Sequence, residues 1–283
     1  MMSEGTAKIR RPAVAGLFYP SDPDELREAI QEYIDRAETE APEGSVVGLI
    51  APHAGYVYSG STAGRAYAAV RGRSYRRVVV MAPSHRAAFD GVSIWPDGAY
   101  RTPLGDVPVD REGAALLIER GRGLVRALPE VHREEHALEV QIPFLQVALG
   151  EFLLVPLVLG DRDLDFAGRL ATLLADCFGS EDTLYVASSD LSHFHTYDDA
   201  VRIDRLLLEL LREGETERLA GALDRGETEA CGAGPILTLA RASSERFGAS
   251  PRFLGYANSG DTAGGKREVV GYASFAYVRE EER

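Results

Sequence analysis

Short apolar runs with strand character alternate with helix-like segments along nearly the whole chain. In the helix-like segments, apolar residues recur at a spacing of three to four positions. Strands that alternate with helices favour a mainly parallel sheet with helices on both faces. We therefore expect one α/β domain over residues 1–283. The clearest strand-like runs are residues 46–52, 76–83, 152–160 and 183–190.

The remaining pattern predicts further elements. Ser21 or Asp22 is expected to cap a helix whose apolar face carries Leu26, Ile30 and Ile34. Pro156 interrupts an otherwise clear strand, which would suit a sheet edge or a bulge. Helices are expected near 60–70, 112–121, 135–150, 198–224 and 234–247, strands at 92–95, 253–259 and 269–278, and a hairpin or loop over 98–110.

Composition narrows the possible function classes. Hydrophobic residues make up 45% of the 283 residues, enough for a substantial core. The formal net charge of −13 disfavours phosphate backbones and anionic lipid, so we expect neither nucleic-acid nor membrane binding. Two cysteines form no disulfide framework, and no apolar segment has the length of a signal peptide or membrane span. These features predict a cytoplasmic protein.

Three predicted strands run directly into histidines. The run at 46–52 leads to His53, the run at 76–83 leads to His85, and the run at 183–190 ends at Asp190, just before His193. In open α/β sheets the carboxyl ends of the strands line the ligand crevice. Imidazoles and a carboxylate delivered there by separate strands would converge on one pocket.

A single histidine of this kind is more often a hydrogen-bonded structural residue than a ligand. The chain holds only six histidines, however, and four of them follow predicted strands. The set therefore favours a common site, although no single member does. His195 is interpreted as a solvated neighbour of His193 and is left out of the site.

Cys231 lies in a turn of small residues that precedes a predicted helix. Unpaired amides and the helix dipole stabilise a thiolate at such a position, as a metal-binding or reactive cysteine requires. The alternative is a small residue packed beneath a glycine-rich turn, and the local sequence favours neither. Cys177 lies on an apolar helical face and is interpreted as a core residue.

Two imidazoles and one thiolate would leave coordination positions open, as in reactive metal sites. Iron, zinc and copper all accept such ligands. Asp190 and His193 are candidates for a general base, a proton relay or the orientation of a bound water, although Asp190 would also suit a turn cap. His136, at the head of a predicted helix, is a candidate for a residue behind the ligands or in contact with substrate, and the alternative is a helix-end histidine without such a role.

Seven separated motifs resemble the Memo family, whose prokaryotic members are named AmmeMemoRadiSam system protein B. The resemblance runs from about residue 11 to about 278. In chain order, the motifs are GLIAPHAGYVYSG, APSH, TPLGD, EHALEVQIPFLQ, SSDLSHF, CGAGP and VVGYASF.

The resemblance implies the fold of class III extradiol dioxygenases, non-haem iron enzymes that open catechol rings. By motif, it implies that His53, His85 and Cys231 are metal ligands. It also implies pocket roles for Asp190 and His193. Tyr58 and Phe18 are further expected to line the substrate cleft, the latter where relatives often carry tryptophan. A partnership with the other AmmeMemoRadiSam proteins is implied as well.

One departure bears on the chemistry: the dioxygenases complete their iron triad with a carboxylate, where this chain has a cysteine. A thiolate is softer and would favour copper or zinc more than a carboxylate does. The leading hypothesis is an Fe(II)-dependent, dioxygenase-like oxidoreductase with His193 as acid or base. The alternatives are a zinc hydrolase on the same ligands, and a non-catalytic protein that binds a peptide or partner or handles metal.

Overall fold

The four clearest apolar runs form adjacent parallel strands. The computed structural model describes residues 9–37 and 42–280. Val, Ile and Leu dominate these runs, and nearly every residue in them is buried, as a strand covered on both faces requires. In spatial order the strands are β2 (Ser45–Ala51), β9 (Thr183–Ser188), β3 (Arg77–Pro83) and β8 (Leu153–Leu159).

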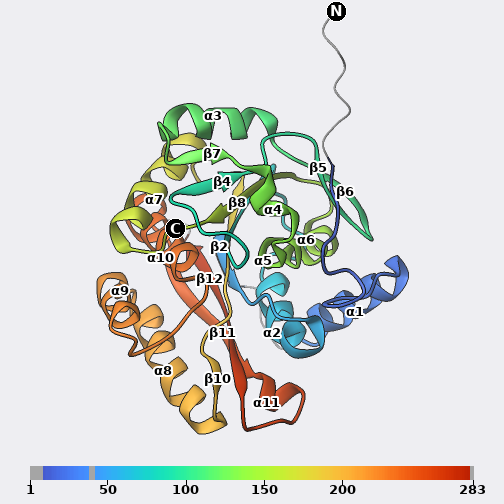
Figure 1. The fold of residues 1–283 in the computed structure, drawn as a ribbon, viewed down its shortest axis with the longest axis vertical. Helices are drawn as coiled ribbons and strands as arrows, with labels where there is room; N and C mark the ends of the chain where they lie inside the picture. The colour runs from blue at the N-terminus through green and yellow to red at the C-terminus, as the bar shows by residue number, and fades with distance from the viewer. Residues whose placement is uncertain (1–8, 38–41, 281–283) are drawn as a thin grey trace, which may run out of the picture.

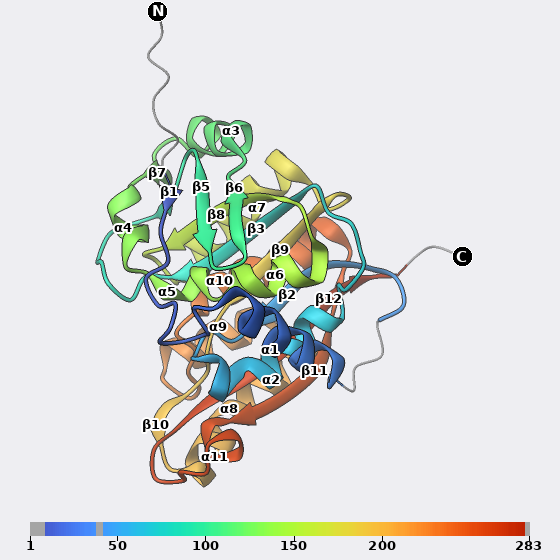
Figure 2. The same cartoon turned by 90° about the vertical axis from the view of Figure 1, so that its right-hand side faces the viewer.

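Antiparallel neighbours extend this parallel centre, so the main sheet is mixed. β12 (Val269–Arg279) pairs antiparallel with β2, and β4 (Val92–Ile94) pairs antiparallel with β8. A small separate sheet lies in the upper part of the view in Figure 2. The outer strands are β7 (Val125–Ala127), β10 (His193–His195) and β11 (Ser250–Asn258), and the small sheet contains β1 (Ile9–Arg10), β5 (Ala99–Thr102) and β6 (Gly105–Pro108).

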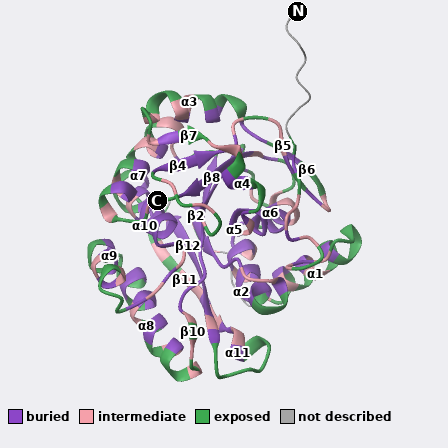
Figure 3. Cartoon of the chain, in the orientation of Figure 1, coloured by how far each residue is buried: buried purple, intermediate pink, exposed green. Residues whose placement is uncertain are grey.

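Helices cover both faces of the main sheet, as the alternating pattern predicted (Figure 1). Successive residues of a strand point to opposite faces, so Val78 and Val80 join one core while Val79 and Met81 join the other. One face packs against α1, α2 and α6, and the other against α7 and α10. Figure 3 shows the buried central strands between partly exposed helices.

The helices occupy much of the remaining chain. Among the helices of the described residues, none is long and apolar enough to cross a membrane. Their bounds are α1 (Pro23–Asp35), α2 (Tyr56–Ala68), α3 (Arg111–Gly121), α4 (Pro129–Arg133), α5 (His136–Glu139), α6 (Gln141–Leu149), α7 (Leu164–Phe178), α8 (Tyr197–Glu213), α9 (Thr216–Asp224), α10 (Ala233–Ala242), η1 (Ser243–Phe247, a π-helical turn) and α11 (Ser259–Thr262).

Local chemistry explains where several helices begin and break. Asp22 caps α1 by accepting hydrogen bonds from the amides of Asp24 and Glu25. The single helix expected over 135–150 is divided into α5 and α6, because Pro143 has no N–H to bond the carbonyl four residues earlier. The stretch expected to be helical over 198–224 is likewise divided, at Gly214, which adopts a left-handed conformation with φ of 71°.

Pro156 does not mark an edge or bulge, so that expectation was wrong. β8 lies inside the sheet between β3 and β4. The antiparallel pairing with β4 begins only at Leu157, opposite Ile94. Pro156 therefore lies just beyond the end of β4, where a missing N–H breaks no hydrogen bond of the ladder.

Candidate metal centre

Three neighbouring parallel strands deliver polar side chains to the same edge of the sheet. His53 follows β2, His85 follows β3, and Asp190 follows β9, which lies between those two strands. The carboxyl ends of parallel strands meet at one edge, which is the usual position of a binding crevice in such sheets. His136 joins them from the first turn of α5.

Three imidazoles form a compact group. Among the described residues, His53, His85 and His136 each offer one ring nitrogen, and these nitrogens all lie within 4.8 Å of one another. The ring centroids of His53 and His85 are 5.2 Å apart, and those of His85 and His136 are 4.9 Å apart. The sequence predicted His136 as a residue behind the ligands or in contact with substrate and did not count it among the metal ligands, whereas the structure places its ring beside those of His53 and His85.

Hydrogen bonds fix which nitrogen of His53 carries its proton. The Ser188 hydroxyl donates to the Ala137 carbonyl, 2.6 Å away, so its single hydrogen is already used. It accepts from the Gln141 amide, whose orientation is set by a second bond to the Pro52 carbonyl. The Nδ1 of His53, 2.9 Å from the same hydroxyl, must therefore donate. The lone pair of Nε2 is left for a ligand.

Burial keeps this imidazole neutral. His53 is only 2% exposed. Burial, together with the nearby imidazoles of His85 and His136, holds the pKa of His53 well below its ordinary value. A neutral ring is the form that binds a metal ion.

Glu135 orients His85 from behind. Its carboxylate accepts a hydrogen bond from the His85 amide at 2.6 Å and from Nδ1 of the His85 ring at 3.0 Å. It also accepts from the Ala137 amide, which starts α5. Burial alone would raise the pKa of Glu135, but these hydrogen bonds hold it below its ordinary value. A carboxylate bonded to the far nitrogen of a histidine is the usual support of a metal ligand.

His136 is half-buried beneath an aromatic side chain. The rings of Phe18 and His136 meet edge to face with centroids 4.9 Å apart. Burial lowers the pKa of His136, against the opposing charge of Glu135. Phe18 thus lies beside the imidazole group, and Tyr58, on the first turn of α2, is 43% exposed. Their expected contact with a substrate stays a prediction.

Cys231, predicted as a metal ligand, contacts His53 but is not a member of the group of three imidazoles. Its sulfur lies 3.1 Å from Nε2 of His53 and 3.3 Å from the amide of Asp190. α10 begins two residues later, at Ala233, yet burial raises the pKa of the thiol. The stabilised thiolate expected from the helix terminus is therefore outweighed by desolvation when no metal ion is bound.

Asp190 is a buried carboxylate beside these ligands. One oxygen accepts a hydrogen bond from the His53 amide at 2.7 Å. Burial raises the pKa of Asp190 to about 7, although amide hydrogen bonds from His53 and Ala54 oppose the shift. A carboxyl group that titrates near neutral pH can donate or accept a proton there.

His193 lies at the edge of a small pocket next to Cys231. Its Nδ1 is 2.8 Å from the Leu191 carbonyl, which can only accept, so the neutral ring presents an unprotonated Nε2. The pocket has a volume of about 220 Å³. His195 instead contacts the Glu229 carboxylate at 2.9 Å.

Sequence reasoning missed the residues that set the proton positions. The sequence pattern singled out none of Glu135, Ser188 and Gln141. A signal existed for Ser188, because it is a polar residue at the end of an otherwise apolar, buried strand. Gln141 lies on an apolar helix and gave no such signal, since its partners come from residues far away in the sequence.

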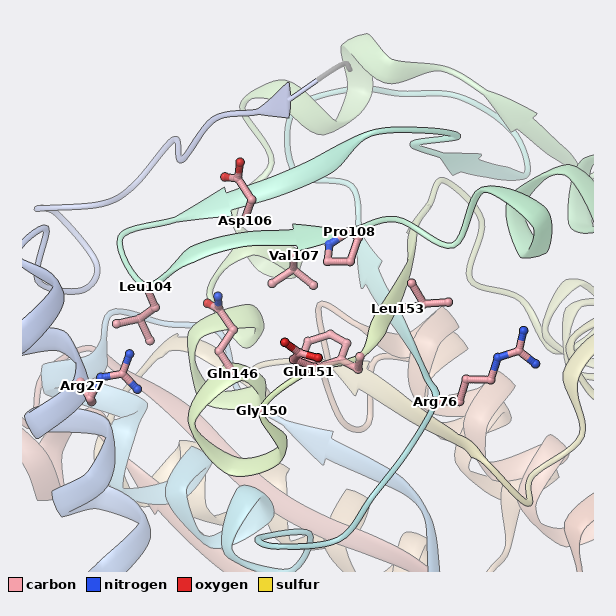
Figure 4. Close-up of a pocket in the computed structure, with 11 residues that line it drawn as sticks. Arg27, Arg76, Leu104, Asp106, Val107, Pro108, Gln146, Gly150, Glu151 and Leu153 are labelled. Carbon is pink, nitrogen blue, oxygen red and sulfur yellow. The ribbon is translucent and has the colours of Figure 1, made fainter. Parts of the chain in front are cut away.

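A larger pocket lies at the opposite end of the strands. It has a volume of about 560 Å³ and adjoins the first residues of β3 and β8. Figure 4 shows Glu151 in its middle, between Arg27 on one side and Arg76 on the other. Its residues take no part in the imidazole group, so this cavity and the candidate chemistry occupy different ends of the sheet.

Comparison with known proteins agrees with this architecture. An uncharacterized protein of Escherichia coli K12 superimposes with a TM-score of 0.54 over 81% of this chain and 98% of its own, at 15% identity, which concerns the fold alone. A MEMO1 family protein of Aeropyrum pernix is 40% identical, covering 94% of this chain and 98% of its own length. That of Thermoplasma volcanium is 36% identical, with 96% and 99% covered.

A third relative, a MEMO1 family protein of Thermotoga maritima, is 37% identical over 94% of this chain and 98% of its own length. The family described as Memo-like protein matches residues 10–276, nearly the whole described chain. The resemblance inferred from the seven motifs is therefore confirmed: this chain belongs to the Memo family.

Proposed function

We propose that this protein binds one transition-metal ion, with Fe(II) as the first candidate, and acts as a non-haem oxidoreductase. His53, His85 and His136 are the proposed imidazole ligands, and Cys231 is the neighbouring thiol ligand. The observation that carries the proposal is the group of three imidazoles, drawn from separate elements, whose ring nitrogens lie within 4.8 Å of one another.

The chemistry of these residues fits a metal ion. Neutral imidazoles suit iron, copper and zinc. The Nδ1 atoms of His53 and His85 are both engaged in hydrogen bonds, to Ser188 and Glu135, so Nε2 is the atom that each ring would offer to the ion. In a tetrahedral site, metal–nitrogen and metal–sulfur bonds of about 2.0 and 2.3 Å place the two ligand atoms about 3.5 Å apart. The 3.1 Å between the Cys231 sulfur and Nε2 of His53 is near that separation.

The protein's own groups would move protons around the ion. A bound redox-active metal would supply electron transfer to or from a substrate at its open positions. His193 would accept a proton at Nε2, because Nδ1 is committed to the Leu191 carbonyl. Asp190, whose pKa is raised to about 7, would exchange its carboxyl proton. Phe18 and Tyr58 would bind the apolar part of a small molecule or peptide.

A second candidate is a zinc-dependent hydrolase whose ligands are the three imidazoles of His53, His85 and His136. Two observations favour it. The group contains three imidazoles, and the carboxylate of Glu135 accepts hydrogen bonds from His85 and Ala137 instead of joining the group as a ligand. Three histidines with an open fourth position form a known catalytic zinc arrangement, which lowers the pKa of bound water toward 7. Asp190 or His193 would then serve as the base.

Metal content separates the two candidates. The protein is purified anaerobically without a metal-affinity tag, and bound metal is measured by elemental mass spectrometry. A His53→Ala/His85→Ala double variant is the control. Near-stoichiometric iron that disappears in the control supports the oxidoreductase, and catechols and thiols are then screened under oxygen. Zinc in its place supports the hydrolase. Absence of bound metal, together with no uptake of added Fe(II), Zn(II) or Cu(II), would overturn the proposal in favour of a binding protein.

A further inference from the structure

A buried ion pair connects the beginning of the described chain to the candidate metal centre. The Arg10 guanidinium contacts the Glu139 carboxylate, and both side chains are almost inaccessible to solvent. Glu139 is the last residue of α5, the short helix that begins with His136. A buried ion pair stabilises a protein only if further hydrogen bonds satisfy the remaining donors and acceptors of both groups. The partners of Arg10 and Glu139 therefore show which segments the pair holds in place.

Glu139 gathers residues 10–19, which we name the N-terminal arm. Its carboxylate accepts hydrogen bonds from the amide of Ala13 at 2.8 Å and from the amide of Val14 at 3.1 Å. The hydroxyl of Tyr19 donates to the same carboxylate. With Arg10 included, four groups of the arm converge on one side chain of α5, and this fixes the arm against the helix.

Arg10 extends the connection to the turn that carries the ligands. Its Nε donates to the His132 carbonyl at 3.0 Å, and a terminal nitrogen donates to the Glu135 carbonyl at 2.6 Å. The side chain of Glu135 in turn accepts both hydrogen bonds from His85. A continuous series of contacts thus runs from Arg10 through Glu135 to a proposed metal ligand.

The arm also reaches the site directly. Phe18, near its end, packs edge to face on the ring of His136. The Phe18 carbonyl accepts a hydrogen bond from the Tyr56 amide at 2.7 Å, at the start of α2. The arm is therefore held at both ends, by Glu139 and by α2, with the imidazole of His136 beneath it.

We propose that Arg10 and Glu139 are positioning residues for the metal centre: their ion pair holds Glu135 and His136 in the arrangement that binds the ion. This inference rests on the proposed function, because it concerns the geometry of the same ligands. The ion pair itself touches none of the three imidazole nitrogens, so its effect passes through the backbone of α5 and through the arm.

A second buried ion pair provides a matched control. Arg77 contacts Asp110 at the amino end of β3, with side chains 11% and 5% exposed. Asp110 caps α3 by accepting a hydrogen bond from the Gly113 amide. Breaking either pair leaves a buried arginine without its carboxylate, so both changes weaken the fold by the same mechanism. Only the Arg10–Glu139 pair contacts the turn with the proposed ligands.

The test uses Co(II) as the probe, with the full chain freed of metal by a chelator that is then removed. Wild type, Glu139→Gln, Asp110→Asn and Glu135→Gln are titrated with Co(II), and the d–d absorption band is recorded with the affinity. We expect Glu139→Gln to weaken Co(II) binding about tenfold and to alter the band, because residues behind the ligands govern metal affinity by about 10–100-fold. Asp110→Asn is expected to stay within about twofold of wild type.

A charge-free variant covers the case in which Glu139→Gln does not fold. Arg10→Met/Glu139→Met removes both charges at similar volume, a change that folded proteins often accept. It also removes the hydrogen bonds to Glu135 and the arm, so the weakening of Co(II) binding should persist in a folded protein.

Wild-type affinity and an unchanged band in a folded Glu139 variant would overturn the positioning role, as would an equal weakening in Asp110→Asn. If wild type itself binds Co(II) no better than the His53→Ala/His85→Ala variant, the proposed function fails first, and the positioning role falls with it.

Discussion

The two ends of the parallel strands differ in how they hold their polar groups. At the carboxyl end, His53, Asp190 and Glu135 are almost fully buried. Asp190 accepts a hydrogen bond from the His53 amide, and Glu135 accepts one from the His85 amide. At the amino end, the larger pocket is lined by exposed charges such as Arg76 and Glu151. Solvated charges of this kind cost little free energy of folding and are common on protein surfaces. Buried, linked ionisable groups are costly, so they are the stronger indication of a functional site.

The larger of the two pockets is not the one beside the candidate catalytic groups. The pocket at the amino end is about 560 Å³, whereas the one beside Cys231 and His193 is about 220 Å³. A large open pocket whose charges already face water offers a ligand little beyond what water offers. The smaller pocket adjoins groups whose pKa values are shifted by burial, and such groups gain most from a bound ion or substrate.

The strongest test of this contrast removes one ligand at the carboxyl end. His53→Ala should weaken metal binding by at least about 100-fold, since it deletes a proposed direct ligand together with the hydrogen bond that its Nδ1 makes to the Ser188 hydroxyl. Isothermal titration with Fe(II) or Zn(II) measures the loss. An affinity within threefold of wild type would move the site away from His53.

The unfolding free energy of wild type and of an Asp190 variant should depend differently on pH. Its pKa is raised from 3.8 to about 7 by burial, so the folded state holds this proton more tightly than the unfolded state. The stability that protonation contributes is complete below about pH 4 and is lost as pH rises through 7. The Asp190→Asn variant has no carboxyl group at this position, so it does not lose stability in this way as pH rises. In the metal-free protein, its unfolding free energy relative to wild type should therefore rise by up to about 4 kcal/mol between pH 4 and pH 8.

Urea unfolding at several pH values, with a chelator present, measures this difference. A difference between Asp190→Asn and wild type that stays constant with pH would mean that Asp190 titrates as an ordinary, solvated carboxyl group.

A smaller effect is expected from the carboxylate behind His85. Glu135→Gln keeps an acceptor for the His85 ring but removes the negative charge that favours its Nδ1 proton. Metal affinity should fall by about 10–100-fold, equivalent to about 1.4–2.7 kcal/mol. Competition with a chromophoric chelator gives the value. An unchanged affinity would indicate that Glu135 serves only to cap α5.

The smallest effect is expected at the amino end. Glu151→Gln replaces an exposed carboxylate, and surface changes of this kind usually alter stability by less than about 0.5 kcal/mol. Neither metal affinity nor the pH dependence of unfolding should change. If this variant weakened metal binding as strongly as Glu135→Gln does, the contrast between the two ends would be lost.

Much of the fold was predictable because its signals are local. A continuous apolar run, such as residues 78–83, must be covered on both faces, and this favours an interior strand. The cap of α1 was predictable in the same way, since Asp22 bonds amides only two and three residues later. The helix breaks at Pro143 and Gly214 were missed, although both residues are known breakers, because strong apolar periodicity on either side masked them.

The sequence by itself determined which residues reach the carboxyl edge of the sheet. His53, His85 and Asp190 each follow an apolar run directly, and chain connectivity therefore carries them to that edge once the strands align in parallel. Cys231 was predicted by resemblance to known motifs, and the structure places its sulfur against His53.

Only the tertiary structure decided the protonation and the grouping of the ligands. The tautomer of His53 depends on Ser188 and Gln141, which are 135 and 88 positions away in the chain, and the ion pair behind α5 joins Arg10 to Glu139 across 129 positions. Such contacts form between side chains whose positions depend on packing of the whole core. No local pattern specifies them, because a hydrogen bond depends on distance in space rather than on spacing in the chain.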